Sequence, residues 1–294
     1  MSNILRRVYN RLHEGTSYRL RTLGRGRWAH HCRPVSICLM LTDLCNARCS
    51  YCEIWKTKAK GIGPTFDQWT TVLRDLRFWL GPVSICFSEG EALLVPFAID
   101  LVAQAASLGL FVELLTCGYW QNQSKIERLA LANPSKVTVR LNGIGETHTK
   151  IRGREEFFER TTTSIATLHH IQKGQDRKYT IQLKCVLMSH NLDDAVKVDE
   201  YAYQPGMEGF FQTIEQNYNT PEDGHWFKRV TTGREIQKKG VPKMQRLISL
   251  KDRGLPIANS IAQVRAMVPY FRDPASMRVI ANRVARPHCW GPAL

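Results

Sequence analysis

The sequence of 294 residues contains no long uninterrupted apolar run. A helix that spans a membrane needs about 20 consecutive apolar residues, and no stretch of this chain approaches that length. The arginines near the N-terminus are not followed by the apolar segment of a secretory signal. Internal repeats and low-complexity segments are absent as well. These absences predict a folded cytoplasmic protein without a membrane-spanning helix.

Acidic residues are scarce: 26 Asp and Glu stand against 41 Lys and Arg, a formal net charge of +15. Residues 1–33 carry eight arginines against Glu14, and residues 265–286 carry five more against Asp273. Apolar residues near the start recur at helical spacing, which predicts a basic amphipathic helix that packs on the main domain or contacts an anionic surface. The imbalance suits an anionic partner such as RNA, a phosphorylated substrate or an acidic membrane, so a peripheral membrane location stays open.

Cysteine is present nine times, but only three of the nine are clustered. An odd number at irregular spacing does not predict a disulfide framework in a reducing compartment, and the scattered six are interpreted as small buried hydrophobes. Cys45, Cys49 and Cys52 lie within LTDLCNARCSYCEIW at 41–55. A structural zinc site usually needs a second pair of ligands, which is missing here. A 4Fe-4S cluster normally takes four thiolates, so three would leave one iron open to a substrate or cofactor.

Strand-like apolar runs alternate with helical patterns through the middle of the chain. The runs lie at 35–41, 83–87, 110–116, 136–141, 179–188 and 209–215. The helical patterns that follow lie at about 66–80, 99–106, 126–129, 155–171, 192–203 and 243–253. This order predicts an α/β fold, a partial (β/α)6 barrel with parallel strands, open or closed.

We divide the chain into a basic N-terminal extension (1–34), a core domain (35–255) and a short C-terminal helical tail (256–294). In parallel α/β sheets, ligands bind at the carboxyl ends of the strands. The clustered cysteines follow the first predicted strand, so they are expected at the rim of an active site.

In that position, CxxxCxxC with the aromatic Tyr51 before its last cysteine resembles the radical S-adenosylmethionine (radical SAM) superfamily. The resemblance implies that Cys45, Cys49 and Cys52 hold one 4Fe-4S cluster and that S-adenosyl-L-methionine chelates the fourth iron. It also implies reductive cleavage to methionine and a 5′-deoxyadenosyl radical, which abstracts hydrogen from the substrate. An electron donor such as flavodoxin or ferredoxin is the implied redox partner.

Two further segments resemble cofactor-binding motifs of this superfamily. FSEGEALL at 87–94 is similar to its glycine-glycine-glutamate motif, which holds the amino group of the cofactor. Ser88, Gly90 and Glu91 fit that motif, while Glu89 stands where the first glycine is usual. RLNG at 140–143 is similar to the Ser-Leu-Asp-Gly segment near the ribose or carboxylate, with Arg140 in place of the serine.

The segment HTKIRG at 148–153 places Arg152 where relatives use an arginine on the cofactor carboxylate, a natural bidentate pairing. LLTCG at 114–118 resembles a Thr-Asn-Gly turn with Cys117 for the asparagine. Because it follows the third strand, Cys117 is expected at the barrel mouth. It is either a hydrogen donor to a substrate radical or a small buried residue in a tight turn.

HCWGPAL at 288–294 resembles the start of the C-terminal extension that carries auxiliary clusters in the SPASM/Twitch branch. Such an extension needs several more cysteines, and only Cys289 is present there. Either the auxiliary region is truncated in this sequence or this member lacks it, so one cluster is expected, with Cys289 as a weak ligand candidate.

The resemblance implies an enzyme that acts on a small-molecule or peptide substrate. Its net reaction stays open among oxidation, epimerisation and transfer. An RNA-modifying enzyme is an alternative because of the positive charge. A second alternative is a cluster-bearing binding partner without cleavage activity, because Glu89, Arg140 and Cys117 depart from the motifs.

Overall fold

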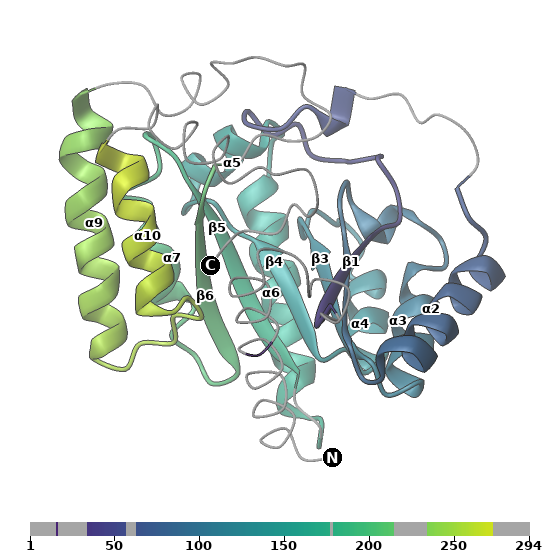
Figure 1. The fold of residues 1–294 in the computed structure, drawn as a ribbon. Coiled ribbons are helices and arrows are strands. Elements are labelled where there is room, and N and C mark those ends of the chain that lie inside the picture. Colours follow the sequence, from purple (N-terminus) through teal and green to yellow (C-terminus); the bar gives the residue numbers. More distant parts are fainter. Residues whose placement is uncertain (1–15, 17–33, 57–62, 177–178, 215–233, 273–294) are drawn as a thin grey trace.

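The computed structural model describes residues 16, 34–56, 63–176, 179–214 and 234–272. Its six strands form one sheet in the order β1-β2-β3-β4-β5-β6, and each neighbouring pair is parallel (Figure 1). The strands are β1 (Ser36–Met40), β2 (Ser84–Ser88), β3 (Phe111–Thr116), β4 (Lys136–Arg140), β5 (Thr180–Leu187) and β6 (Met207–Thr213). β1 and β6 are the two edges, so the barrel is open. The prediction of a partial (β/α)6 barrel is confirmed.

Helices cover one face of this sheet, and α9 and α10 lie side by side next to β6 (Figure 1). The helices are η2 (Ile54–Lys56), α2 (Phe66–Leu80), η3 (Ala92–Leu94), α3 (Ala98–Ser107), α4 (Ser124–Leu131), α5 (Glu146–Arg152), α6 (Phe157–Lys173), α7 (Asp194–Tyr201), α9 (Arg234–Asp252) and α10 (Ile261–Arg272). Local chemistry sets several of the ends. At the start of α2, for example, Thr65 and Gln68 form a capping box that satisfies two free backbone N–H groups.

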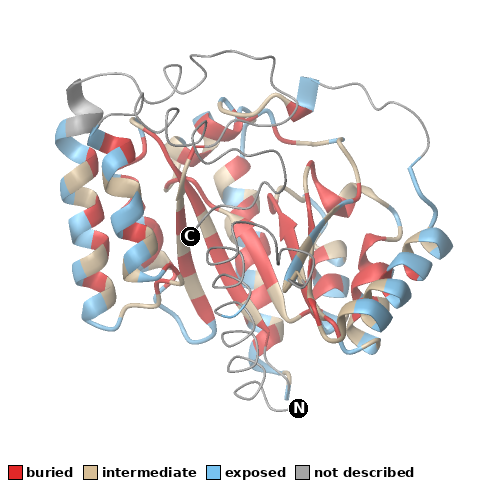
Figure 2. Ribbon diagram, viewed as in Figure 1, coloured by how far each residue is buried: buried red, intermediate tan, exposed pale blue. Residues whose placement is uncertain are grey.

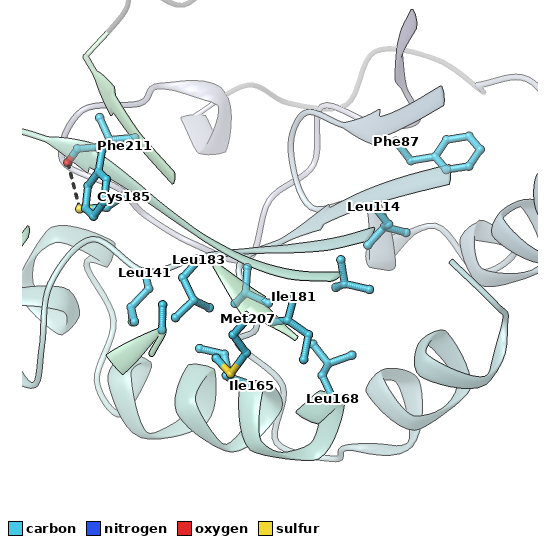
Figure 3. Packing of buried hydrophobic residues seen from close by; sticks show 14 of the residues in the cluster. Phe87, Leu114, Leu141, Ile165, Leu168, Ile181, Leu183, Cys185, Met207 and Phe211 are labelled. Atoms are coloured by element: carbon cyan, nitrogen blue, oxygen red, sulfur yellow. Dashed lines mark hydrogen bonds between the residues drawn. The ribbon is translucent and has the colours of Figure 1, made fainter. Parts of the chain in front are cut away.

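Side chains alternate between the two faces of the sheet. The outer face, which the helices cover, buries apolar residues such as Phe87, Leu114 and Leu183, and Ile165 and Leu168 of α6 belong to the same core cluster (Figure 3). Figure 2 shows that buried residues concentrate along the strands and on the sides of the helices that face them. The opposite, inner face carries mostly polar side chains. This arrangement leaves the inner face and the carboxyl ends of the strands for chemistry.

Three local features differ from the sequence predictions. β6 begins at Met207, two residues before the predicted run at 209. The seven-residue helix α5 was not predicted, because about two turns are too short to show a helical period. α9 begins at residue 234 and contains Pro242, whereas the predicted helix started after this proline. The missing N–H of Pro242 costs stability, and burial of the apolar side chains that follow it offsets that cost.

The predicted N-terminal amphipathic helix, the part of the C-terminal tail after residue 272 and Cys289 lie outside the described residues. The division into 1–34, 35–255 and 256–294 stays a prediction. Within the described ranges, no helix is both long enough and apolar enough to cross a membrane.

Candidate active site at the cysteine loop

A cavity of about 160 Å³ lies at the carboxyl ends of the strands, beneath the loop that carries the clustered cysteines. Its walls are formed by Cys45, Ala47, Cys49, Tyr51, Cys52, Ile54, Trp55, Ser88, Glu89, Gly90, Leu115, Arg140, Lys184, Val186 and Gln212. The cavity therefore brings together eight of the site residues predicted from the sequence. The other three, Glu91, Arg152 and Cys117, do not line it.

The cysteine loop is held on one side by the turn after β2. The backbone N–H of Glu91 donates to the carbonyl of Leu44 at 2.8 Å. Gly90 has a φ of 53°, and a Cβ there would lie 2.4 Å from the Leu44 oxygen and 2.6 Å from that of Thr42. Only glycine fits this close approach of two backbones. The motif glycine is thus explained by packing against the cysteine loop.

On its other side the loop rests on the end of α5. The backbone N–H groups of Arg48 and Ser50 donate to the carbonyls of Arg152 and Ile151, both at 2.9 Å. Gly153, with a φ of 70°, ends α5, and a Cβ there would lie 2.4 Å from the Arg48 oxygen. Two glycines with positive φ therefore clamp the cysteine loop between β2 and α5.

Burial raises the pKa of the Cys45 thiol to about 11 and also raises that of Cys52. These thiols are therefore protonated at neutral pH, and binding of a metal centre would release their protons. Across the described ranges, no three His, Cys, Asp or Glu side chains converge tightly enough to hold one metal ion. A 4Fe-4S cluster does not need that convergence, because each thiolate bonds a different iron. Three cysteines on one clamped loop beside a cavity fit this donor set.

Arg152 is fully buried beneath the loop. Its Nη1 donates to Cys49 Sγ at 3.1 Å and lies 3.4 Å from the Tyr51 hydroxyl, while its Nη2 donates to the Arg140 carbonyl at 3.0 Å. Burial works to lower the pKa of Arg152, but Tyr51 and Cys49 outweigh it and the net pKa is raised. The guanidinium turns inward to a cysteine sulfur and a backbone carbonyl, and Arg152 does not line the cavity. Its role on the cofactor carboxylate stays a prediction.

The Tyr51 hydroxyl belongs to a buried network that sequence reasoning missed. Asn142 Nδ2 donates to the Tyr51 oxygen at 3.1 Å, and the Asn142 backbone N–H donates to His148 Nδ1 at 2.9 Å. His148 therefore carries its proton on Nε2, and burial lowers its pKa, which keeps the ring neutral. Asn142 lies in the segment RLNG and His148 in the segment HTKIRG. Their places in these two motifs were the only sequence features that could have pointed to the network.

Glu91 is fully buried, and its carboxylate is already engaged. It accepts from the Thr116 hydroxyl at 2.8 Å and from the Cys117 backbone N–H at 2.6 Å, and it caps η3 through Leu93. Glu91 is therefore not a solvent-exposed carboxylate. Its hydrogen bonds join the ends of β2 and β3.

Cys117 is 1% exposed and does not reach the cavity. Its thiol donates to Asn46 Oδ1 at 3.2 Å, and it packs against Ala47, Cys49 and Phe157. The expected position at the barrel mouth is corrected by this packing, which matches the alternative of a small buried residue in a tight turn. Its short side chain makes room for the cysteine loop.

Glu89 has a φ of 66°, the left-handed conformation that favours glycine, and its side chain borders the cavity. The backbone therefore keeps the shape that the first glycine of the motif normally supplies. A carboxyl-bearing residue in this conformation pays about 1 kcal/mol or more in backbone strain.

Two cations lie side by side on the cavity wall. Arg140 and Lys184 are register partners on β4 and β5, and both line the cavity. The Lys184 ammonium also lies 5.7 Å from the centre of the Phe210 ring on β6. Among the described residues, no carboxylate lies within 4.0 Å of the Arg140 guanidinium, which suits an anionic group of a ligand. Lys184 and Gln212 were not predicted from the sequence, because a polar side chain inside a strand usually marks a face that is exposed to solvent.

A profile of the Radical SAM superfamily matches residues 39–195, more than half of the chain. Sporulation killing factor maturation protein SkfB of Bacillus subtilis is 30% identical over 135 residues, which cover 46% of this chain and 33% of that protein. AdoMet-dependent heme synthase of Methanosarcina barkeri is 25% identical over 219 residues, which cover 70% of this chain and 61% of that protein.

The fold is similar to that of SuiB from Streptococcus suis, solved bound to S-adenosylmethionine, with a TM-score of 0.60 and 11% identity. The match covers 76% of this chain and 49% of SuiB. SuiB has also been solved bound to its precursor peptide SuiA. Because only 11% of the aligned residues are identical, this similarity supports the fold and nothing further. The chain spans less than two thirds of the length of each of these three proteins.

Proposed function

The chain belongs to the radical SAM superfamily, and we propose that it is an enzyme that cleaves S-adenosylmethionine at a 4Fe-4S cluster in order to modify a peptide. When bound, the cluster and S-adenosylmethionine supply a 5′-deoxyadenosyl radical that abstracts hydrogen. The observation that carries the proposal is the cavity at the cysteine loop, where three thiols meet two cations and the turn at Ser88, Glu89 and Gly90.

In this proposal Cys45, Cys49 and Cys52 hold the cluster. The buried guanidinium of Arg152 stabilises the negative charge on Cys49 through its 3.1 Å contact. The Tyr51 hydroxyl contacts the same Nη1 nitrogen at 3.4 Å and helps to orient the guanidinium. The turn at Ser88, Glu89 and Gly90 presents its backbone to the methionine amino group, and Glu91 keeps the turn in place through its bonds to β3.

Arg140 is proposed as the partner of the cofactor carboxylate, in place of Arg152. It is the motif arginine that lines the cavity, and no protein carboxylate lies within 4.0 Å of it among the described residues. Loss of a charged hydrogen bond costs about 1.5–3 kcal/mol, so Arg140→Gln should weaken cofactor binding at least about tenfold. Titration of S-adenosylmethionine onto reconstituted wild type, Arg140→Gln and Arg140→Lys tests this role. Equal affinities would refute it.

A peptide substrate is supported by what the printed names of the relatives say. SkfB is named as a maturation protein for a killing factor, and SuiB was solved with a precursor peptide. Lys184 on β5 and Gln212 on β6 line the same cavity wall, and the substrate is proposed to lie against them. The net charge of +15 favours a peptide with acidic residues.

An electron donor of the flavodoxin or ferredoxin type is proposed as the redox partner. Arg48, Trp55 and Lys56 are exposed on or beside the cysteine loop, the shortest route to a cluster there. The positive charge of Arg48 and Lys56 suits an acidic donor. Contact of the basic N-terminal region with a membrane or RNA remains a proposal for residues outside the described ranges.

The deciding experiment compares wild type with the triple variant Cys45→Ala, Cys49→Ala, Cys52→Ala after anaerobic reconstitution. Wild type should hold about four irons per chain and form 5′-deoxyadenosine when reduced with S-adenosylmethionine. The triple variant should do neither, while the matched control Cys185→Ala, a buried cysteine on β5, should behave as wild type. Iron retained by the triple variant would sink the proposal.

The peptide part is tested separately, on peptides encoded beside the gene. A mass change that requires S-adenosylmethionine and is absent with the triple variant supports it. Deoxyadenosine formation without change in any of these peptides, but with change in a porphyrin or an RNA, would move the substrate to another class.

A further inference from the structure

Two of the scattered cysteines become neighbours in the sheet. Cys38 on β1 and Cys86 on β2 are register partners in a parallel pair, so both side chains project from the inner face. Cys38 is exposed and Cys86 is half-buried, and both are free thiols. Neither lines the cavity of the cysteine loop. The two residues are 48 positions apart in the sequence, and nothing in their local spacing predicts the contact.

The spacing of the two strands suits a bond between these thiols. Neighbouring strands lie about 4.8 Å apart, and disulfides join Cα atoms that are about 4.4–6.8 Å apart. Cys86 and Ser88, the next inner residue of β2, both lie close enough to the Cys38 thiol to lower its pKa. The pair can therefore be bridged with little movement of the backbone.

The two thiols differ in their electrostatic surroundings. The hydrogen bond from Cys86 lowers the pKa of Cys38 to about 7, against the opposing effects of burial and of Glu89 and Glu113. The same hydrogen bond, followed by burial and Glu113, raises the pKa of Cys86. Lys136 forms a 2.9 Å ion pair with Glu113 and offsets part of that charge. One exposed, partly ionised thiol beside one protonated thiol is the arrangement of an attacking and a resolving cysteine.

We propose that Cys38 and Cys86 form a redox-active dithiol, separate from the cluster site, that exchanges with small disulfides of the glutathione type. The Cys38 thiolate attacks one sulfur of the small disulfide, whose S–S bond breaks as a mixed disulfide forms and one thiolate leaves. Cys86 gives its proton to solvent and attacks the Cys38 sulfur, which releases the second thiolate. The protein pair loses two electrons, and the small disulfide gains them as two thiols.

The cross-strand bond would act on the strands that hold the cysteine loop. β1 is an edge strand whose only strand partner among the described residues is β2, and the cysteine loop follows β1 directly. β2 leads into the turn that packs against this loop through Gly90. The disulfide would tie the two supports of the cysteine loop together. Oxidised protein should therefore unfold at a higher temperature than reduced protein.

The experiment equilibrates the reconstituted holoprotein in anaerobic glutathione buffers of increasing oxidised fraction. Acid quenching, alkylation and non-reducing peptide mass spectrometry then identify each cysteine's partner, and the iron content is measured in the same samples. Wild type should yield a peptide pair joined at Cys38 and Cys86 while its iron is retained. Cys86→Ser should instead carry glutathione on Cys38, because the resolving thiol is gone. Cys38→Ser should yield neither product.

Cys185→Ser is the matched control, because Cys185 is a fully buried strand cysteine. It should give the same joined peptide as wild type, over the same range of buffers. Absence of the joined peptide in the most oxidising buffer would overturn the proposal. So would a joined peptide that appears only in step with iron release, or a Cys86→Ser variant that carries no glutathione on Cys38.

Discussion

On its outer face the sheet buries Ile85, Phe87 and Leu114 completely, whereas on the inner face the same two strands carry Cys86 and Glu113. Polar contacts continue across the inner face. Thr138 donates to Glu113 at 2.6 Å, and Gln182 donates to Glu208 at 2.7 Å. One face holds the fold together by burial, and the other positions groups that can bind or react. Stability and function should therefore respond to different substitutions.

The largest effect on stability is expected from the outer face. Phe87→Ala would leave a cavity in the apolar core beneath the outer face and should lower the free energy of unfolding by about 3–5 kcal/mol. Lys184→Gln, its inner-face control, should change it by less than about 1 kcal/mol. Chemical denaturation of both variants measures the difference. Equal losses would show that the inner face contributes to folding as much as the outer one.

Substitution of Arg152 should affect both stability and the site, because Arg152 is buried like a core residue but contacts Cys49. Arg152→Gln should lower the free energy of unfolding by about 1.5–3 kcal/mol through loss of its charged hydrogen bonds. It should also reduce the iron held after reconstitution, since Cys49 loses its donor. Iron analysis and denaturation on the same preparations test both. Unchanged iron with the stability loss would make Arg152 a purely structural residue.

Asp199 is a polar exception on the outer side. Its carboxylate is fully buried on α7 beside Gly209 of β6, and neither oxygen has a hydrogen-bond partner among the described residues. Burial raises the pKa of Asp199 to about 6, above its value of about 3.9 in an unfolded chain. The raised pKa favours the protonated folded state at low pH, and this stabilisation is lost as the pH rises through about 6.

Asp199→Asn should therefore raise the thermal midpoint at pH 8 and leave it nearly unchanged at pH 4. Thermal unfolding of both proteins across this range gives the answer. A variant that loses stability at pH 8 would mean that the carboxylate has a partner in solution. Glu127→Gln, at an exposed position on α4, serves as the control.

The smallest effect is expected at Glu89, on the rim of the inner face. Glu89→Gly should gain about 0.5–1 kcal/mol of stability by relieving the positive φ, and it should leave cofactor affinity unchanged. A clear loss of S-adenosylmethionine affinity would instead assign the Glu89 carboxylate a direct role. Denaturation and cofactor titration are measured side by side.

The order of strands and helices could be predicted from the sequence because the apolar patterns of β2, β3 and β5 are local and long enough to show a period. The helix α5 and the true start of α9 could not, since one is too short and the other runs through Pro242. At the site, the cysteine spacing and the turn at Gly90 were visible in the sequence. The inward turn of Arg152 and the burial of Cys117 were not, because both depend on what the cysteine loop packs against.

The sequence by itself determined the alternation of strands and helices and the three-thiol motif after the first strand, since both are encoded over a few neighbouring residues. Only the tertiary structure decided which side chains meet across strands: Arg140 beside Lys184 and Cys38 beside Cys86. Strand register is set by the packing of the whole outer face on its helices. A shift of one residue would turn every inner side chain to the outer face, so these pairs exist only once the sheet is assembled.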